Sequence, residues 1–379
     1  MQNASVQAVD VSVPVQAVRL QSLDVFRGGV IASMILVNNN GSSEAYGPLK
    51  HAAWHGWTFT DLVFPFFLWI VGVAITFSFA RRVERGDDRG KLFAHVLKRA
   101  AIIFGIGLFL NGFPFFDLST IRIPGVLQRI ALCYLIAATI FLFTKTSGRV
   151  IWCAGLLSLY WILMKMVPVP GCGVNSFEMA CNFAKWIDGM TLWGHMYSQT
   201  KTWDPEGVIS TLPAISNVLF GIFAGQILRT QKTTAEKSNW LLFAGATLTF
   251  AGLMLSTWMP VNKSLWTSPY AVLTSGLAFL VFGCCYWLVD VLQWRRYTKP
   301  FVIYGMNALA MFILSGLFAR IISIVKIDGT SLRTLLWRDT FAPLLASPPM
   351  ASLLFSLAHV ALFWLIAWWM YRRNWVIRA

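Results

Sequence analysis

The chain has 379 residues, of which 57% are hydrophobic and only 12% are charged, and its formal net charge is +15. Soluble globular domains carry about 25% charged residues, so this composition excludes an ordinary soluble fold and indicates a polytopic membrane protein. The positive charge is typical of the basic loops that orient membrane helices. No basic stripe with interleaved aromatic residues indicates nucleic-acid binding.

The N-terminal stretch MQNASVQAVDVSVPVQAV lacks the basic region and apolar core of a cleaved signal peptide. We expect residues 1–22 to form a cytoplasmic tail without stable order and residues 23–379 to form a single transmembrane domain. A full span needs about 20 mainly apolar residues. Segments of this kind predict an all-α polytopic membrane protein, a bundle of about ten transmembrane helices. The predicted spans are Val25–Val37, Asp61–Ala80, Lys98–Phe113, Val126–Thr144, Val150–Val167, Val208–Leu228, Trp240–Met259, Ser268–Val289, Phe301–Val325 and Ala351–Tyr371.

The distribution of Lys and Arg predicts an N-in, C-in topology, with both termini in the cytoplasm. With the N-terminus inside, most of the 31 Lys and Arg residues fall in cytoplasmic segments such as Arg81–Arg99. The largest loop on the other side is an extracytoplasmic loop at about 168–207. It contains Cys172 and Cys181, nine residues apart. In an oxidising compartment these can form a disulfide, or they can remain two unpaired thiols.

The densest titratable cluster lies directly before the second predicted span, in the stretch LKHAAWHGWTFTDLVFPFFLWIVG (49–72). Ionisable residues at membrane spans are costly and are candidates for function. His51 with Asp61 nearby can act as a general base, as a nucleophile that carries an acyl group, or as a proton relay in a transporter. Asp61 could also serve only as a cap at the helix start. His51 and His55 are four residues apart, but no further Cys, His or carboxylate completes a set, so no metal site is predicted.

Seven stretches, one of them the cluster just described, occur in a fixed order along most of Ser22–Gly316. They are SLDVFRG (22–28), ILVNN (35–39), KHAAWHGWTFTDLVFPFFLWIVG (50–72), GVLQRIALCYL (125–135), DPEGVISTLPAI (204–215), NKSLWTSPYAVL (262–273) and YGMNALAMFILSG (304–316). Together they resemble the catalytic membrane domain of heparan-α-glucosaminide N-acetyltransferase and its bacterial relatives. Each stretch alone is a weak signal, but the combination is specific.

The resemblance implies an acetyl-CoA-dependent N-acetyltransferase. Members of that family move an acetyl group from cytoplasmic acetyl-CoA to the amine of a terminal glucosamine on the far side of the membrane. His51 matches the catalytic histidine of the family and Asn38 matches an asparagine that is also implicated. Asp61 and Arg129 match an aspartate and an arginine of its motifs. The resemblance also implies a homodimer and, for a bacterial relative, a multi-pass protein of the inner (cytoplasmic) membrane.

The cytoplasmic donor leads to a hypothesis about three arginines. Arg27, Arg99 and Arg129 are expected to contact the phosphates of acetyl-CoA, because Arg offers paired donors to phosphate. Arg99 could instead belong to the ordinary basic anchoring of an inner loop. Arg129 could instead form a structural ion pair with Asp24 or Asp61.

The acetyl acceptor is expected to bind beside His51. On this hypothesis His51 removes the proton of the sugar amine while Asp61 orients its imidazole, or His51 is itself acetylated first. Asn38 donates a hydrogen bond to the developing oxyanion. Trp54 stacks on the sugar ring, and Lys50 is assigned to the same substrate site.

The sequence departs from the lysosomal members of the family at His55, where those usually have asparagine, and it shows no counterpart of their luminal domain. We therefore expect a smaller amino sugar or a cell-envelope glycan as acceptor rather than polymeric heparan. The competing hypothesis is a proton-coupled transporter or binding protein for amino sugars, which would use the same intramembrane charges. No inverted repeat and no matched pair of broken helices supports transport in the sequence.

Overall fold

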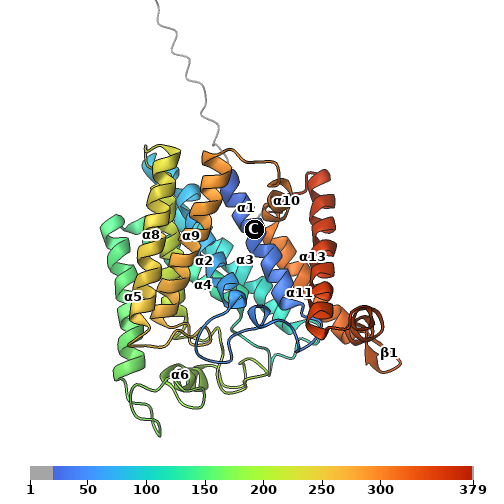
Figure 1. Cartoon of the computed structure of the whole chain (residues 1–379). Coiled ribbons are helices and arrows are strands. Elements are labelled where there is room, and N and C mark those ends of the chain that lie inside the picture. Colours follow the sequence, from blue (N-terminus) through green and yellow to red (C-terminus); the bar gives the residue numbers. More distant parts are fainter. Residues whose placement is uncertain (1–19, 378–379) are drawn as a thin grey trace, which may run out of the picture.

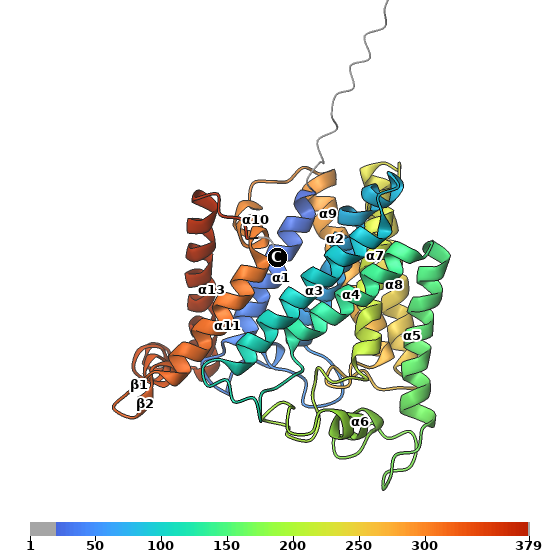
Figure 2. The ribbon, with the colours of Figure 1, turned by 180° about the vertical axis from the view of Figure 1, so that it is seen from behind.

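The computed structural model describes residues 20–377 and consists almost entirely of helices that run up and down between two ends (Figures 1 and 2). The predicted all-α polytopic fold is confirmed. The elements are α1 (Gln21–Asn38), η1 (Gly47–Leu49), α2 (Phe59–Glu84), α3 (Arg89–Gly112), α4 (Val126–Phe143), α5 (Thr146–Met166), α6 (Phe183–Thr191), α7 (Thr211–Leu228), α8 (Thr234–Leu255), α9 (Ser268–Tyr286), η2 (Trp287–Val291), α10 (Lys299–Met306), α11 (Ala308–Ile324), β1 (Lys326–Ile327), β2 (Thr330–Ser331), α12 (Leu332–Leu335), η3 (Leu336–Phe341), η4 (Ala342–Leu344) and α13 (Pro348–Arg372).

Every predicted span corresponds to a helix, but the number long and apolar enough to cross a membrane is smaller than ten. Eight of the described helices meet that criterion, and the bent pair α10–α11 supplies a ninth. The first predicted span forms α1 but lies outside this set, because Asp24, Arg27 and two glycines dilute its apolar residues. Helix α1 begins at Gln21, slightly before the predicted end of the tail. Residues 1–19 of that predicted tail lie outside the described residues.

The ends of the bundle differ in sequence and structure. We call inner the end at which α1 begins and α13 finishes, and outer the end that carries α6 (Figure 1). The start of α2 at the outer end is fixed by a capping box between Thr58 and Asp61. The start of α8 at the inner end is fixed by a capping box between Thr233 and Glu236. The helices therefore begin where the sequence supplies side chains for the unpaired N–H groups.

Close crossings at glycine hold the central helices together. Helices α2 and α7 meet at Gly72 and Gly221, where an added Cβ would lie 1.9 Å from a backbone oxygen of the other helix. Helices α1 and α10 meet in the same way at Gly28, where a Cβ would lie 1.8 Å from the Phe301 carbonyl oxygen. Small residues let membrane helices approach until their backbones touch. Helix α1 is thereby held among α2, α9, α10 and α13.

A break at Asn307 bends the ninth predicted span by 79° between α10 and α11. The buried Asn307 amide donates to the Trp375 carbonyl (2.9 Å) and accepts from the Ile377 N–H (3.0 Å). The last described residues of the chain therefore supply both hydrogen-bond partners of the Asn307 side chain at the break.

Candidate active site

A cavity of about 460 Å³ lies at the outer end of the bundle. Its polar lining comes from loops and helix ends, and its apolar lining comes from the helices. The polar members include Asn38, His51, Asp61, Arg122, Glu206 and Lys263. The apolar members include Val30, Met34, Phe67, Ile130 and Phe312. Along α1, Val30 lies roughly 12 Å from Asn38 at 1.5 Å per residue, so the cavity extends from a polar mouth into the membrane interior.

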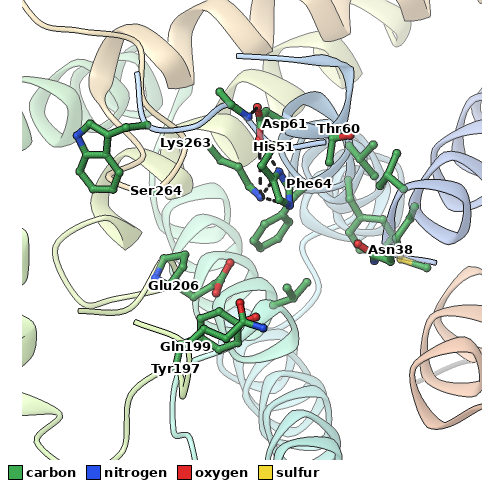
Figure 3. Close-up of a pocket in the computed structure, with 18 of the residues that line it drawn as sticks. Asn38, His51, Thr60, Asp61, Phe64, Tyr197, Gln199, Glu206, Lys263 and Ser264 are labelled. Atoms are coloured by element: carbon green, nitrogen blue, oxygen red, sulfur yellow. Dashed lines mark hydrogen bonds and ion pairs between the residues drawn. The ribbon is translucent and has the colours of Figure 1, made fainter. Parts of the chain in front are cut away.

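His51 and Asp61 form a hydrogen-bonded pair in the wall of this cavity (Figure 3). Asp61 is only 1% exposed, and its Oδ1 lies 2.6 Å from His51 Nδ1. Its Oδ2 accepts from the N–H groups of Ala52 (3.0 Å) and Thr58 (3.0 Å). Asp61 therefore caps α2 and orients the histidine at the same time. Because a carboxylate only accepts, the hydrogen of the imidazole lies on Nδ1 and Nε2 carries the lone pair.

Lys263 completes one wall of the cavity. It lies in the loop between α8 and α9, and its Nζ is 3.1 Å from His51 Nδ1 and 3.2 Å from His51 Nε2. Its Nζ is also 3.9 Å from Asp61 Oδ1. Burial lowers the pKa of Lys263, and the carboxylates of Glu206 and Asp61 partly offset that effect. Asp61 and Lys263 contact the imidazole, but the His51 side chain remains 56% exposed and is therefore open to the cavity.

The facing wall is a second charge cluster, built on Arg122. Its guanidinium donates to Asp204 through Nε (2.8 Å) and Nη2 (2.6 Å), and Nη2 also donates to Glu206. The guanidinium carbon lies 4.6 Å from the centre of the Tyr197 ring. Although burial opposes the charge, the two carboxylates raise the pKa of Arg122 above its ordinary value. Glu206 and Tyr197 face the His51 cluster across the cavity (Figure 3).

A buried layer behind this wall fixes the segment that carries Glu206. Asp188 of α6 accepts the N–H groups of Asp204 and Val208, each at 3.1 Å. Burial raises the pKa of the Asp188 carboxyl to about 6, despite those two hydrogen bonds. Arg129, at the outer end of α4, donates to the Gly207 carbonyl (3.2 Å) and to the Ser210 hydroxyl. Its guanidinium also packs over the Trp266 ring at 4.9 Å.

The three arginines predicted to bind phosphates do not come together. Arg27 lies near the start of α1, with its Nη1 3.5 Å from Asp24 Oδ1. Arg99 lies in α3, with its guanidinium 5.3 Å from the centre of the Tyr134 ring. Arg129 is 1% exposed at the opposite end and pairs with neither of the aspartates considered for it. None of the three lines the described cavity.

The predicted acceptor residues are divided between the cavity and the surface. Asn38 lines the cavity on the side away from Lys263 (Figure 3). Trp54 also lines it, donates its indole N–H to the Phe177 carbonyl (2.8 Å) and meets the Trp203 ring edge-on at 5.3 Å. Lys50 is exposed, points to the Ser43 carbonyl (3.4 Å) and is not part of the lining. The substrate role predicted for Lys50 therefore has no support from its position.

The predicted disulfide lies at the outer end of the bundle, in the segment between α5 and α6 (Figure 1). The structure joins Cys172 and Cys181, with Cα atoms 5.9 Å apart. Met179 of the same segment lines the cavity.

Arg122, Glu206 and Lys263 are the site residues that sequence reasoning missed. Glu206 and Lys263 belong to the motif stretches DPEGVISTLPAI and NKSLWTSPYAVL, and Arg122 lies three residues before GVLQRIALCYL. The available signal was a charged residue inside or beside a motif next to an apolar span.

The chain belongs to the heparan-α-glucosaminide N-acetyltransferase catalytic-domain family. The sequence model of that family, described as heparan-alpha-glucosaminide N-acetyltransferase, catalytic, matches residues 19–259. The resemblance seen in the motifs is thereby confirmed. The matched region contains His51, Asp61, Arg122 and Glu206 and ends just before Lys263.

Two curated relatives carry the name heparan-alpha-glucosaminide N-acetyltransferase. The protein of Homo sapiens is 30% identical over 351 residues, covering 78% of this chain and 52% of the relative. The protein of Mus musculus is 29% identical over 350 residues, covering 78% of this chain and 53% of the relative. The chain thus spans about half the length of the curated relatives it matches.

Proposed function

We propose that this chain is a transmembrane acetyltransferase that moves an acetyl group from acetyl-CoA to the amine of a glucosamine-type sugar. Membership in the family supports the reaction class. The observation that carries the proposal is an exposed imidazole in a cavity, His51, bound through Nδ1 to the buried carboxylate of Asp61.

The reacting atom in this proposal is His51 Nε2. A sugar ammonium is not nucleophilic, so the imidazole first takes its proton, and Asp61 stabilises the imidazolium that forms. In the other route, Nε2 attacks the thioester carbonyl and releases CoA, and the sugar amine then takes the acetyl group from the imidazole. Both routes use the same atom and give the same products, CoA and an N-acetylated sugar.

Asn38 is the proposed donor to the oxyanion that develops on the thioester carbonyl. It is the last residue of α1 and is exposed to the cavity. Within residues 20–377, no hydrogen bond engages its side-chain amide, so the amide is free to donate. A preorganised donor of this kind acts strongly where water is excluded.

The apolar depth of the cavity suits the acetyl group and the pantetheine arm of the donor. Arg27 lies on the same face of α1 as Val30 and Met34, one turn nearer the inner end. We infer that Arg27, with Arg99 on α3, meets the donor phosphates on the cytoplasmic side. We reassign Arg129 to the support of the segment that carries Glu206, because its hydrogen bonds end there.

The polar mouth of the cavity suits an amino sugar. Asp61 and Glu206 supply the mouth with carboxylates that can pair with a sugar ammonium, beside the cations of Lys263 and Arg122. The rings of Trp54 and Trp203 offer apolar faces of the kind on which sugar rings pack. The amine of the sugar is thereby directed toward His51.

The orientation proposed for the chain is N-in and C-in, with acceptor transfer on the extracytoplasmic side. The basic residues of 81–91 lie at the inner end and the segment with Cys172 and Cys181 lies at the outer end, which supports such a topology. A homodimer in a bacterial inner membrane follows from the family resemblance and belongs to the same proposal.

Proton-coupled transport is the second candidate, and the bend between α10 and α11 is the feature that favours it. In this chain, however, the Asn307 side chain at the break is hydrogen-bonded to the backbone of Trp375 and Ile377, so it is not open to a substrate. Transfer therefore accounts for more of the site than transport does.

The proposal is tested by free CoA release from acetyl-CoA with the purified chain. Glucosamine is the acceptor, and N-acetylglucosamine, whose amine is blocked, is the matched control. We expect release with glucosamine and none above background with the control. Absence of release with glucosamine, together with glucosamine-dependent proton uptake into liposomes that contain the protein, would favour transport instead.

A further inference from the structure

An amine of the protein already lies against the proposed base. A base acts on a proton within about 2.6–3.2 Å of its acceptor atom. Lys263 Nζ lies beside the His51 ring, 3.1 Å from Nδ1 and 3.2 Å from Nε2. Among the described residues that line the cavity, Lys263 is the one lysine. Lys50, although it neighbours His51 in sequence, is directed to the surface.

We propose that Lys263 is a self-acetylation site: when acetyl-CoA is bound and no acceptor fills the cavity, the acetyl group passes to Lys263 Nζ and closes the site. The inference rests on the proposed function and adds a regulation to it. Lys263 then reports the ratio of donor to acceptor, because acetylation competes with transfer to the sugar.

The reaction balances with the groups present. His51 Nε2 takes a proton from the Lys263 ammonium, and the neutral amine attacks the thioester carbonyl. A C–N bond forms and the C–S bond breaks. The CoA thiolate leaves and takes a proton from His51, and the remaining amine proton passes to water at the exposed imidazole. The products are free CoA and an Nζ-acetyl-lysine, the same chemistry as transfer to a sugar amine.

The surroundings of Lys263 favour this lysine over exposed ones. Its side chain is 20% exposed, and burial lowers its pKa, so more of it is neutral near pH 7 than of a lysine in water. Lys201, an exposed lysine of the same outer region, provides the comparison. Self-acetylation of Lys263 should therefore begin at a lower pH than chemical acetylation of Lys201.

Acetylation changes the site in two ways. The amide carries no charge, so Asp61 and Glu206 lose a cation that faces them. The added acetyl group also stands within contact of the His51 ring, where the acceptor amine must bind. Both effects reduce transfer to a sugar.

The first test incubates the purified full chain with acetyl-CoA alone and measures the acetylated fraction of Lys263 and Lys201 by peptide mass spectrometry. We expect Lys263 to become acetylated well above Lys201 in the wild type and to fall to the Lys201 level in His51→Ala. Added glucosamine should slow the modification. Two results would overturn the proposal: equal acetylation of Lys263 with and without His51, or no acetylation in protein that releases CoA with glucosamine. Protein that neither modifies Lys263 nor releases CoA with glucosamine would overturn the proposed function as well.

The second test follows activity after preincubation with acetyl-CoA. The wild type should lose glucosamine-dependent CoA release in proportion to the acetylated fraction. Lys263→Arg keeps a cation but has no acetylatable amine, and each protein is compared with its own rate before preincubation. We expect the fractional rate of Lys263→Arg to stay constant. An equal fractional loss in both proteins would show that another event inactivates the enzyme.

Discussion

The two walls of the cavity, one built on His51 and the other on Arg122, both pair a cationic or basic side chain with carboxylates, but the pairs have different properties. On one wall a buried carboxylate, Asp61, holds an imidazole whose Nε2 is open to the cavity. On the other wall Arg122 is bound on two sides by Asp204 and Glu206, and the Asp204 side chain is fully buried. A group held at one atom and open at the other can react, whereas a saturated ion pair resists change. In the proposed function the His51 wall is therefore the chemical wall, and the Arg122 wall is the scaffold.

The largest effect is expected from His51→Ala. Loss of a general base or an acyl carrier should lower kcat/KM by about 10²–10⁴-fold. The unfolding midpoint should fall only slightly, because the ring is 56% exposed and the buried Asp61 keeps the N–H donors of Ala52 and Thr58 and the nearby Lys263 cation. His55→Ala is the matched control, since His55 contacts Asn262 and does not line the cavity. Similar kinetic losses in both variants would remove His51 from the chemistry.

A smaller loss is expected from Asn38→Ala. If the amide donates only to the developing oxyanion, kcat should fall by about 10²–10³-fold while KM for the donor stays close to the wild-type value. Asn38→Asp, which cannot donate, should lose at least as much. Steady-state kinetics separate the two constants, and a change confined to KM would make Asn38 a binding residue instead.

The scaffold wall is tested by Arg122→Met. The variant leaves Asp204 and Glu206 buried without their cation, and breaking a buried ion pair costs about 3–5 kcal/mol. We expect the lower end, about 3 kcal/mol, because the Arg122 side chain is 20% exposed. Chemical denaturation in detergent measures it. Arg338→Met is the control, because its pair with Asp339 is exposed and should contribute little.

The smallest effect is expected from Trp54→Phe. The variant keeps an aromatic ring at the mouth but loses the hydrogen bond to the Phe177 carbonyl. A hydrogen bond of this kind contributes about 1 kcal/mol, so a loss that acts only through the position of the ring should raise KM for the sugar by roughly fivefold at most. Trp57→Phe serves for comparison, because Trp57 lies outside the cavity lining. An equal change in both variants would indicate a general effect on the outer end.

The chemical wall could be predicted from sequence because its two main members are close in the chain. His51 and Asp61 are ten residues apart, and Asp61 occupies the third position after Thr58 in a capping box. Both the orientation of a histidine and the start of a helix were therefore encoded in one short stretch. Lys263 belongs to the same wall but lies 212 residues from His51, so only the packing of α8 and α9 against α2 and α7 brings it there.

The scaffold wall could not be predicted because its members lie far apart in the chain. Arg122 meets Asp204 across 82 residues and Glu206 across 84. In the fold, the apolar runs located the helices well, because burial in lipid demands such runs. The bend at Asn307 was missed, since YGMNALAMFILSG gives one continuous apolar pattern and its partners come from the end of the chain.

The central claim is that reaction and stability belong to different walls, and one paired measurement tests it most directly. Glucosamine-dependent CoA release and the unfolding midpoint are recorded on the same preparations of His51→Ala and Arg122→Met. The account predicts lost release with only a slight fall in midpoint for His51→Ala, and a much lower midpoint for Arg122→Met with release that follows the folded fraction. A destabilised His51→Ala that still releases CoA, beside an Arg122→Met of wild-type stability, would contradict it.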